Sequence, residues 1–326
     1  MAYSDRRNIH DRGIGFAATT IVTLTVVSVL LITTCFVLHC KGLSHKPQPN
    51  PAIIPEDNQT TEQAQTPENE PEVAPEPTFL DVHFIDVGQA DAALVSCDGH
   101  HMLIDGGNGT DSSLIFSYLR DHDIAHLDYI IATHVHEDHI GGLSGALNFA
   151  SVSKVYCTTS EYDSKVFSNL VKYTEKHGAE IEIPSVGDEF MLGGASVKIL
   201  AVNSTSEIND TSIVLKIVHG ENSFIFTGDA ERATEQIILE SGEEIKADVL
   251  KVGHHGSENA TTYPFLREIM PKYAVISVGE GNTYGHPTEA VLSRLRDAEA
   301  TVLRTDFHGD IIFESDGMNL TVTTEK

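Results

Sequence analysis

Cysteine and basic residues are both scarce in this chain, and each scarcity argues against a class of function. Four cysteines occur among 326 residues, and none forms a Cys-x-x-Cys pair, the spacing typical of zinc ribbons and dithiol redox sites. Lys and Arg number 21 against 48 Asp and Glu, which gives a formal net charge of -27. Such an acidic surface repels phosphate backbones at long range, so we expect no broad nucleic-acid track and only local phosphate contacts, for instance through metal.

Two further features narrow the fold class. The chain has no repeat with a fixed period of about 20 to 50 residues, so a solenoid or propeller is not expected. Its length favours one large catalytic domain with accessory segments.

Cys97 and Cys157 are isolated in the sequence, and they form either a disulfide outside the cell or two buried free thiols.

One long apolar run lies near the N-terminus, at residues 14–38. Its 25 positions are uncharged and mostly apolar, and about 20 such residues suffice to cross a bilayer. A cleavable signal peptide is the alternative, but its apolar region would span only about 7 to 15 residues. We expect a single-pass anchor in the cell membrane, with residues 1–13 as a short cytoplasmic tail. Three arginines precede the run and two lysines follow it, which slightly favours an extracellular position for the rest of the chain.

Residues 39–78 are expected to form a disordered linker, because their Pro, Glu and Thr content leaves almost nothing to bury. From residue 79 to 326, short apolar runs alternate with Gly, Asp and Asn. Helical spacing appears at four places, with Thr288 as the expected N-cap of the last: 112–122, 164–177, 233–242 and 288–300. This mixture predicts one layered α/β domain over 79–326.

The densest group of metal-ligand side chains lies in THVHEDHIGG, residues 133–142. Side chains alternate in an extended segment, so His134 and His136 point the same way, and a turn near Asp138 brings Asp138 and His139 toward a neighbouring position. This arrangement suits two adjacent metal ions, one for each pair. Imidazole together with carboxylate favours zinc, manganese or iron over calcium.

Two more ligand-rich segments follow apolar strands. SFIFTGD ends in Asp229, and DVLKVGHHGS, residues 248–257, contains His254 and His255. Strands that end in His or Asp at one edge of a sheet bring ligands together from distant sequence positions. A solvated histidine-rich loop therefore explains the pattern poorly.

These motifs resemble those of the metallo-β-lactamase superfamily. THVHEDHIGG, FTGDA and LKVGHHGS look like its successive metal motifs. FIDVGQADA, MLIDGG, NDTSIVL, YGHPTEAVLSRL and TDFHGDI are similar to the branch that includes the soluble domain of ComEC-type competence proteins. The resemblance covers most of residues 79–326 in the expected order, and it implies a four-layer αββα sandwich with the site at one edge of the two sheets.

The resemblance also implies ligands for one or two divalent ions, zinc or manganese. Carried over by position, they are His134 and His136 for the first ion and Asp138, His139 and His254 for the second, with Asp229 as a bridge. The residues do not decide between His254 and His255. We expect His254 because it directly follows the strand and Gly253, which leaves His255 and Ser257 for substrate binding. The superfamily usually supplies a third histidine to the first ion where this chain has Asn209-Asp210, so a single tightly bound ion is the alternative.

Other polar residues are expected around this site. Asp86 and Asp91 are expected to make turn and loop hydrogen bonds, with a supporting role behind the metal ligands as the alternative. Asp105 is expected to orient the histidine loop. The resemblance implies that His286 lies near the site, and Ser257, Thr305 and Asp306 are candidates for its rim. The remaining histidines have no ligand-type spacing and are expected to be ordinary surface or core residues: His83, His100, His101, His122, His126, His177, His219 and His308.

The expected reaction is metal-dependent hydrolysis. Metal coordination lowers the pKa of water from 15.7 to about 7, and the expected catalytic residues are Asp138, which would orient this water, and His286, which would protonate the leaving oxygen. The resemblance favours a phosphodiester in nucleic acid or in a smaller envelope phosphoester, and the acidic charge favours the smaller substrate. The alternatives are a lactam or thioester hydrolase and a non-catalytic, membrane-tethered metal-binding module. No protein partner is evident.

Overall fold

In the computed structural model of the protein, residues 78–326 are described. The expected tail at 1–13, the anchor at 14–38 and all but the last residue of the linker lie outside the described residues, so these expectations stay predictions. Between residues 78 and 326, no helix is both long and apolar enough to cross a bilayer. The first strand begins at Leu80, close to the expected start of the α/β domain.

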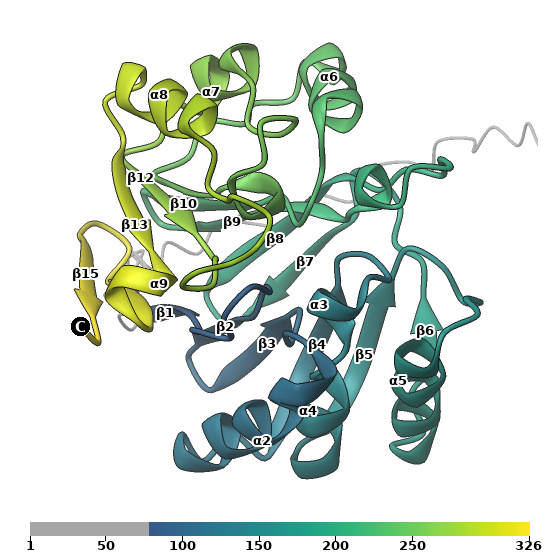
Figure 1. Ribbon diagram of the computed structural model, residues 1–326. Helices are drawn as coiled ribbons and strands as arrows, with labels where there is room; N and C mark the ends of the chain where they lie inside the picture. The colour runs from purple at the N-terminus through teal and green to yellow at the C-terminus, as the bar shows by residue number, and fades with distance from the viewer. Residues whose placement is uncertain (1–77) are drawn as a thin grey trace, which may run out of the picture. The chain divides into compact units, whose positions relative to one another are not determined.

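Residues 78–326 contain two mixed β-sheets (Figure 1). The first sheet has the strand order β15 (Leu320–Thr324), β14 (Ile311–Ser315), β1 (Leu80–Phe84), β2 (Ala93–Cys97), β3 (His100–Ile104), β4 (His126–Ala132), β5 (Ser151–Cys157) and β6 (Ile181–Glu182). From β3 to β6 the neighbours are parallel, and from β15 to β3 they are antiparallel. The carboxyl ends of β3, β4 and β5 therefore meet at one edge of the sheet.

The second sheet repeats this mixture of parallel and antiparallel pairs. Its order is β13 (Thr301–Arg304), β12 (Tyr273–Ile276), β11 (Val249–Lys251), β10 (Asn222–Phe226), β9 (Val214–His219), β8 (Ala195–Ala201) and β7 (Glu189–Leu192). From β10 to β13 the neighbours are parallel, and from β7 to β10 they are antiparallel. Because β10 and β11 are parallel neighbours, the segments that follow them emerge at the same edge.

An apolar layer fills the space between the two sheets. Leu80, Val82 and Phe84 alternate along β1 and face this layer, as expected for the period of two in a strand. Phe226 of β10 faces them from the second sheet, and the rings of Phe84 and Phe226 stack with centroids 5.4 Å apart. This packing holds the two sheets face to face and so positions the strand ends of one sheet opposite those of the other.

Helices cover the outer face of each sheet (Figure 1). On the first sheet these are α2 (Ser112–Asp121), α3 (Glu137–Ile140), α4 (Leu143–Phe149) and α5 (Lys165–Lys176). On the second they are α6 (Arg232–Ser241), α7 (Tyr263–Ile269) and α8 (Glu289–Asp297). The short elements are η1 (Gly109–Asp111), η2 (Asn209–Thr211), η3 (Gly253–Gly256) and α9 (Thr305–His308). The described residues thus form the expected αββα sandwich.

All four helices expected from spacing are present, as α2, α5, α6 and α8. Thr288 caps α8 as expected, since its side chain accepts a hydrogen bond from the backbone of Val291. Helical spacing did not single out the short helices α4 and α7, although Gly141-Gly142 in the histidine motif predicts a close approach followed by a helix, which is α4. In α4, a Cβ at Gly145 would lie 1.8 Å from the backbone oxygen of Ser112 in α2. This helix therefore forms through close tertiary packing that helical spacing does not reveal.

The two cysteines of the described domain are thiols. Cys97 ends β2 and Cys157 ends β5, and within residues 78–326 both are free and buried. Burial raises the pKa of both thiols. Of the two alternatives left open by the sequence, free thiols are confirmed and the disulfide is wrong.

Candidate metal centre

The histidine motif lies where β4 ends and α3 begins. His134 follows β4 after one residue, His136 directly precedes α3, and Asp138 and His139 lie in the first turn of that helix. The change from extended chain to helix occurs inside the motif. It therefore turns Asp138 and His139 toward the same region as His134 and His136.

A close contact between α3 and the loop at 106–109 positions this motif. Gly106 N donates to His139 O at 2.7 Å, and Gly142 N donates to Gly107 O at 3.0 Å. A Cβ at Gly142 would lie 1.9 Å from Gly106 O. The glycine that ends the motif therefore permits an approach that no side chain would allow.

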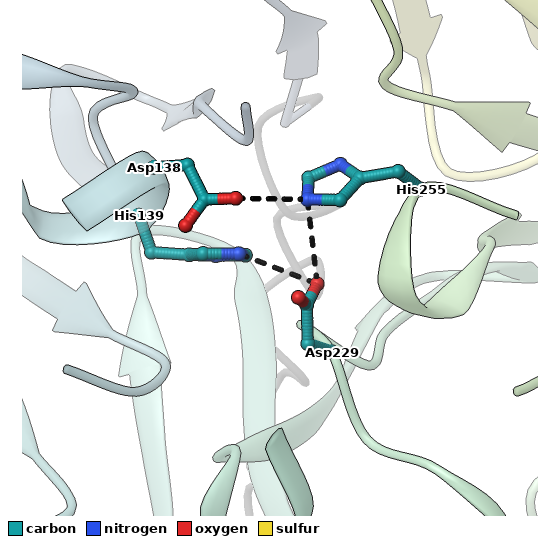
Figure 2. Close-up of side chains that lie close together, drawn as sticks. All are labelled: Asp138, His139, Asp229 and His255. Carbon is teal, nitrogen blue, oxygen red and sulfur yellow. Dashed lines mark ion pairs between the residues drawn. The ribbon is translucent and has the colours of Figure 1, made fainter. Parts of the chain in front are cut away.

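Four side chains from three segments lie together in a group that could hold a metal ion (Figure 2), and we call them the second-ion cluster: Asp138, His139, Asp229 and His255. Asp229 follows β10 and His255 belongs to η3. His139 Nε2 lies 3.3 Å from Asp229 Oδ1. His255 Nε2 lies 3.3 Å from Asp138 Oδ2 and 3.7 Å from Asp229 Oδ1.

Asp229 also belongs to a second group, the first-ion cluster, together with His134 and His136. His134 Nε2 lies 2.9 Å from His136 Nδ1 and 3.9 Å from Asp229 Oδ2. One carboxylate thus takes part in both clusters, through different oxygens. This is the placement expected of a residue that bridges two ions.

Three atoms of the second-ion cluster test whether a metal ion fits. Within residues 78–326, His139 Nε2, His255 Nε2 and Asp229 Oδ1 are buried and have no hydrogen-bond partner. Buried polar atoms nearly always have a partner. Two imidazole nitrogens and a carboxylate oxygen are donors that suit zinc and related divalent ions. The side chains present therefore fit a divalent cation.

Carboxylates hold protons on two of the clustered histidines. Burial opposes a charged ring, but Asp229 and Asp91 raise the pKa of His255 to about 10. Burial is likewise outweighed at His139, where Asp229 and Asp105 raise the pKa well above its ordinary value. A divalent ion would supply the positive charge that these protons supply here, so the electrostatics of the cluster also suit a cation.

A model of the metallo-beta-lactamase superfamily matches residues 85–280. The chain belongs to the metallo-β-lactamase superfamily. The match runs through both clusters, from the segment after β1 to the loop after β12, and it confirms the resemblance drawn from the motifs.

Two curated relatives in this superfamily are competence proteins. The chain is 32% identical over 251 residues to ComE operon protein 3 of Bacillus subtilis, covering 71% of this chain and 32% of that protein. It is 30% identical over 249 residues to Competence protein ComA of Neisseria gonorrhoeae, covering 74% of this chain and 33% of that protein. The chain thus spans about a third of the length of these relatives. A solved structure, the metallo-beta-lactamase fold protein YhfI from Bacillus subtilis, is 15% identical over 72% of this chain and 100% of its own, with a TM-score of 0.49.

The second-ion cluster of this metallo-β-lactamase member contains His255, where we expected His254. The two histidines are consecutive, and both adopt left-handed backbone angles, with φ of 48° at His254 and 51° at His255. Their side chains diverge as a result, and His255 is the one that reaches Asp138. The sequence offered no signal for this, because it does not reveal the backbone angles of η3.

Asn209 and Asp210 occupy the place where the superfamily usually supplies a third histidine for the first ion. Asp210 Oδ1 accepts from the backbone of Glu231 at 3.0 Å and of Thr234 at 3.2 Å, at the start of α6. Its carboxylate is therefore used to anchor α6. Asn209 Nδ2 lies 3.3 Å from His254 Nδ1. Neither residue is part of the two clusters.

Asp105 supports the second-ion cluster from behind. Its Oδ2 accepts from His139 Nδ1 at 2.8 Å and from Thr133 Oγ1 at 2.7 Å, and its Oδ1 accepts from Thr133 N at 2.8 Å. The bond to Nδ1 leaves Nε2 of His139 free to face Asp229. Carboxylates often orient metal-binding histidines in this way, and the structure places Asp105 where the sequence analysis expected it.

A buried ion pair that the sequence analysis missed lies next to the second-ion cluster. Lys251 Nζ lies 2.7 Å from Asp91 Oδ2, and both side chains are almost fully buried. Asp91 Oδ1 lies 3.3 Å from His255 Nδ1, which also donates to Ser277 O at 3.0 Å. Asp91 thus takes the supporting position that was its alternative role. A lysine inside the apolar run DVLKVG was the available signal.

His286 lies beside His254, close to the clusters. The two ring centroids are 5.6 Å apart and nearly perpendicular, and Tyr284 stacks against His286 at 5.9 Å. Among the described residues, His286 Nδ1 has no hydrogen-bond partner. Burial, followed by His254 and His255, lowers the pKa of His286, so the ring is neutral near pH 7.

The other candidates have partners in the fold. Ser257 follows η3, and its backbone N donates to His254 O at 2.8 Å. Asp86 Oδ1 accepts from Gly88 N at 3.2 Å, which is the turn hydrogen bond expected for it. Thr305 bonds to the backbone of Val278, and Asp306 pairs with Arg304. Contact of Ser257, Thr305 or Asp306 with substrate stays a prediction.

Proposed function

We propose that this chain is a membrane-anchored, metal-dependent hydrolase that cleaves phosphodiester bonds. One observation carries the proposal: His139 Nε2, His255 Nε2 and Asp229 Oδ1 meet in a buried cluster and have no hydrogen-bond partner among residues 78–326. A divalent ion bound by such donors lowers the pKa of a coordinated water to about 7 and polarises a phosphoryl group. Membership of the metallo-β-lactamase superfamily supports the same reaction class.

Asp138 and His286 handle protons in this proposal. Burial opposes ionisation of Asp138, but the rings of His255, 3.3 Å away, and His139 lower its pKa, so the group is a carboxylate at neutral pH. It is about one third exposed, more than the other members of its cluster, and can accept a hydrogen bond from an attacking water. The neutral ring of His286 has an unpartnered Nδ1 and can take part in proton transfer to the leaving oxygen.

The substrate class follows from relatives and charge. The similarity to competence proteins supports a phosphodiester over a lactam or thioester. The formal net charge of -27 disfavours an extended DNA track and favours a smaller phosphoester of the cell envelope. The apolar run at residues 14–38 supports a membrane anchor that would hold this activity at the outer surface of the cell membrane. Protease added to intact cells should therefore degrade the domain, and full protection would refute this location.

The test uses the full 326-residue chain, purified in mild detergent and supplied with Mn²⁺ or Zn²⁺. We expect hydrolysis of bis-p-nitrophenyl phosphate, weaker cleavage of single-stranded DNA, and no turnover of the lactam nitrocefin. The substitutions His134→Ala, Asp138→Ala and Asp229→Ala should each lower turnover on the order of 10³-fold or more, because the ligands act as one unit.

His126→Ala is a matched control. This exposed histidine is the first residue of β4, at the end of the strand opposite the histidine motif, and it bonds to Ser151 and Ser153 of β5. Its turnover should equal that of the wild type. Undiminished turnover in the three cluster variants would refute the mechanism. Turnover of nitrocefin alone would replace the phosphodiester with the lactam alternative.

A further inference from the structure

We propose that His254 is a ligand of the first ion, so that Asp229 joins two sets of imidazoles, one at each carboxylate oxygen. This inference deepens the proposed function and rests on its metal centre. It concerns a residue outside both of the clusters described above, and it assigns the two histidines of η3 to different ions.

The distances around Asp229 form two matching sets. Its Oδ1 is faced by His139 Nε2 at 3.3 Å and by His255 Nε2 at 3.7 Å. Its Oδ2 is faced by His134 Nε2 at 3.9 Å and by His254 Nε2 at 3.6 Å. Each oxygen therefore has two imidazole nitrogens at 3.3 to 3.9 Å, longer than the usual N–H···O distance of about 2.7 to 3.2 Å. Within residues 78–326, Asp229 Oδ1 and the two nitrogens that face it have no hydrogen-bond partner, and a cation beside each oxygen would be in reach of both of its nitrogens.

The backbone of η3 explains how adjacent histidines reach opposite sides of one carboxylate. His254 (φ 48°, ψ 50°) and His255 (φ 51°, ψ 23°) are both left-handed, a conformation that L-residues adopt rarely and at some energetic cost. Their ring centroids are 6.1 Å apart, with the planes inclined by 65°. Two consecutive strained residues at a cluster of ligand-type side chains indicate that both ring positions serve the site.

A carboxylate behind His254 fixes which nitrogen faces Asp229. His254 Nδ1 donates to Glu231 Oε1 at 2.9 Å, so Nε2 carries the lone pair, with Asn209 Nδ2 at 3.5 Å as its other polar neighbour. Metal-binding histidines usually donate their other ring nitrogen in this way. Glu231 is itself held by Asp210, which accepts from its backbone N. With His134 and His136, the side chain of His254 would give the first ion three imidazoles and one carboxylate oxygen, a donor set that suits zinc.

Metal binding tests this assignment without measuring turnover. The full chain is titrated with Zn²⁺ against a chromophoric chelator, and bound metal is counted after dialysis. We expect two ions in the wild type. His254→Ala should weaken one ion by more than about 100-fold, since loss of a ligand exceeds the 10- to 100-fold cost of losing a residue behind one. His255→Ala should weaken the other ion, and Glu231→Gln should weaken the same ion as His254→Ala.

His286→Ala is the local control, because its ring lies against that of His254 but belongs to neither cluster. It should keep both ions at wild-type affinity. His254→Asn, a smaller change, is measured in parallel with thermal unfolding so that a folding defect is recognised. Two ions at unchanged affinity in both His254 variants would overturn the assignment, as would a wild-type chain that binds a single ion.

The proposed function and this assignment fail separately. A chain that binds two ions, loses one through His254→Ala and hydrolyses no phosphodiester would refute the proposed function and support the assignment. A chain that hydrolyses phosphodiesters and keeps both ions in the His254 variants would support the proposed function and refute the assignment.

Discussion

Two groups of buried histidines in this domain differ in their electrostatics. At the metal centre, Asp229 and Asp91 outweigh burial and raise the pKa of His255 to about 10. On the outer face of the first sheet, His83 of β1 lies against Tyr118 of α2, and burial together with His122 lowers its pKa to about 4. The same side chain is thus held charged at one place and neutral at the other.

The difference shows that burial and proximity of histidines do not by themselves make a metal site. His83 Nδ1 lies 2.8 Å from the hydroxyl of Tyr118, so its hydrogen bond is made within the fold. His139 and His255 instead leave Nε2 without a hydrogen-bond partner among residues 78–326, next to a buried carboxylate. Unpartnered ring nitrogens beside buried carboxylates distinguish the metal centre, and the following changes test that distinction.

The largest effect on stability is expected from Lys251→Met. This change leaves the buried carboxylate of Asp91 without its partner at 2.7 Å, so the free energy of unfolding should fall by about 3 to 5 kcal/mol. Urea denaturation measures it. The double variant with Asp91→Asn should recover much of the loss, because no unpaired charge then remains.

Lys198→Met is the matched control for this ion pair. Lys198 is paired with Glu243 at 2.8 Å on the surface, and exposed pairs contribute at most about 1 kcal/mol. If Lys251→Met lowered the free energy of unfolding no more than Lys198→Met does, the buried ion pair between Lys251 and Asp91 would not be important for stability.

A smaller effect, confined to metal binding, is expected from Asp105→Asn. The amide has nearly the same size, and its oxygen can still accept from Thr133 N, but its nitrogen cannot accept from His139 Nδ1. The affinity of the second ion should fall by about 10- to 100-fold, measured by chelator competition. Asp128→Asn, which removes a carboxylate from surface His100, should leave the affinity unchanged. Equal affinities in both variants would contradict the orienting role of Asp105.

The smallest effect is expected from His83→Gln, and it concerns pH. The unfolded chain protonates His83 near pH 6.5, but the folded chain does so only near pH 4. This residue therefore lowers the free energy of unfolding as pH falls from about 6.5 to about 4. Glutamine does not titrate, so the variant should lose about 1 to 2 kcal/mol of that pH dependence. Urea denaturation at pH 7 and pH 4 measures it, and identical pH dependence in both proteins would contradict burial as the cause.

Much of the site could be predicted from local sequence because its ligands follow strands. THVHEDHIGG, FTGD and VGHHGS come directly after β4, β10 and β11, and parallel strands deliver their carboxyl ends to a common edge. Asp138, His139 and Asp229 were found in this way. The exchange of His254 and His255 was not, because it depends on left-handed angles at two non-glycine residues. Lys251 was also missed, because its partner Asp91 is far away in sequence.

The amino-acid sequence by itself determined the layered α/β class, the order of the metal motifs and the acidic charge, since these depend on residue type and on periodicity along the chain. The four-layer αββα arrangement came only from the family resemblance. Tertiary structure alone decided which oxygen of Asp229 each histidine faces and that Lys251 neutralises Asp91. It also decided that His83 stays neutral while His255 is charged. These outcomes depend on burial and on charges brought together from both sheets, and neither quantity is a property of a local stretch of sequence.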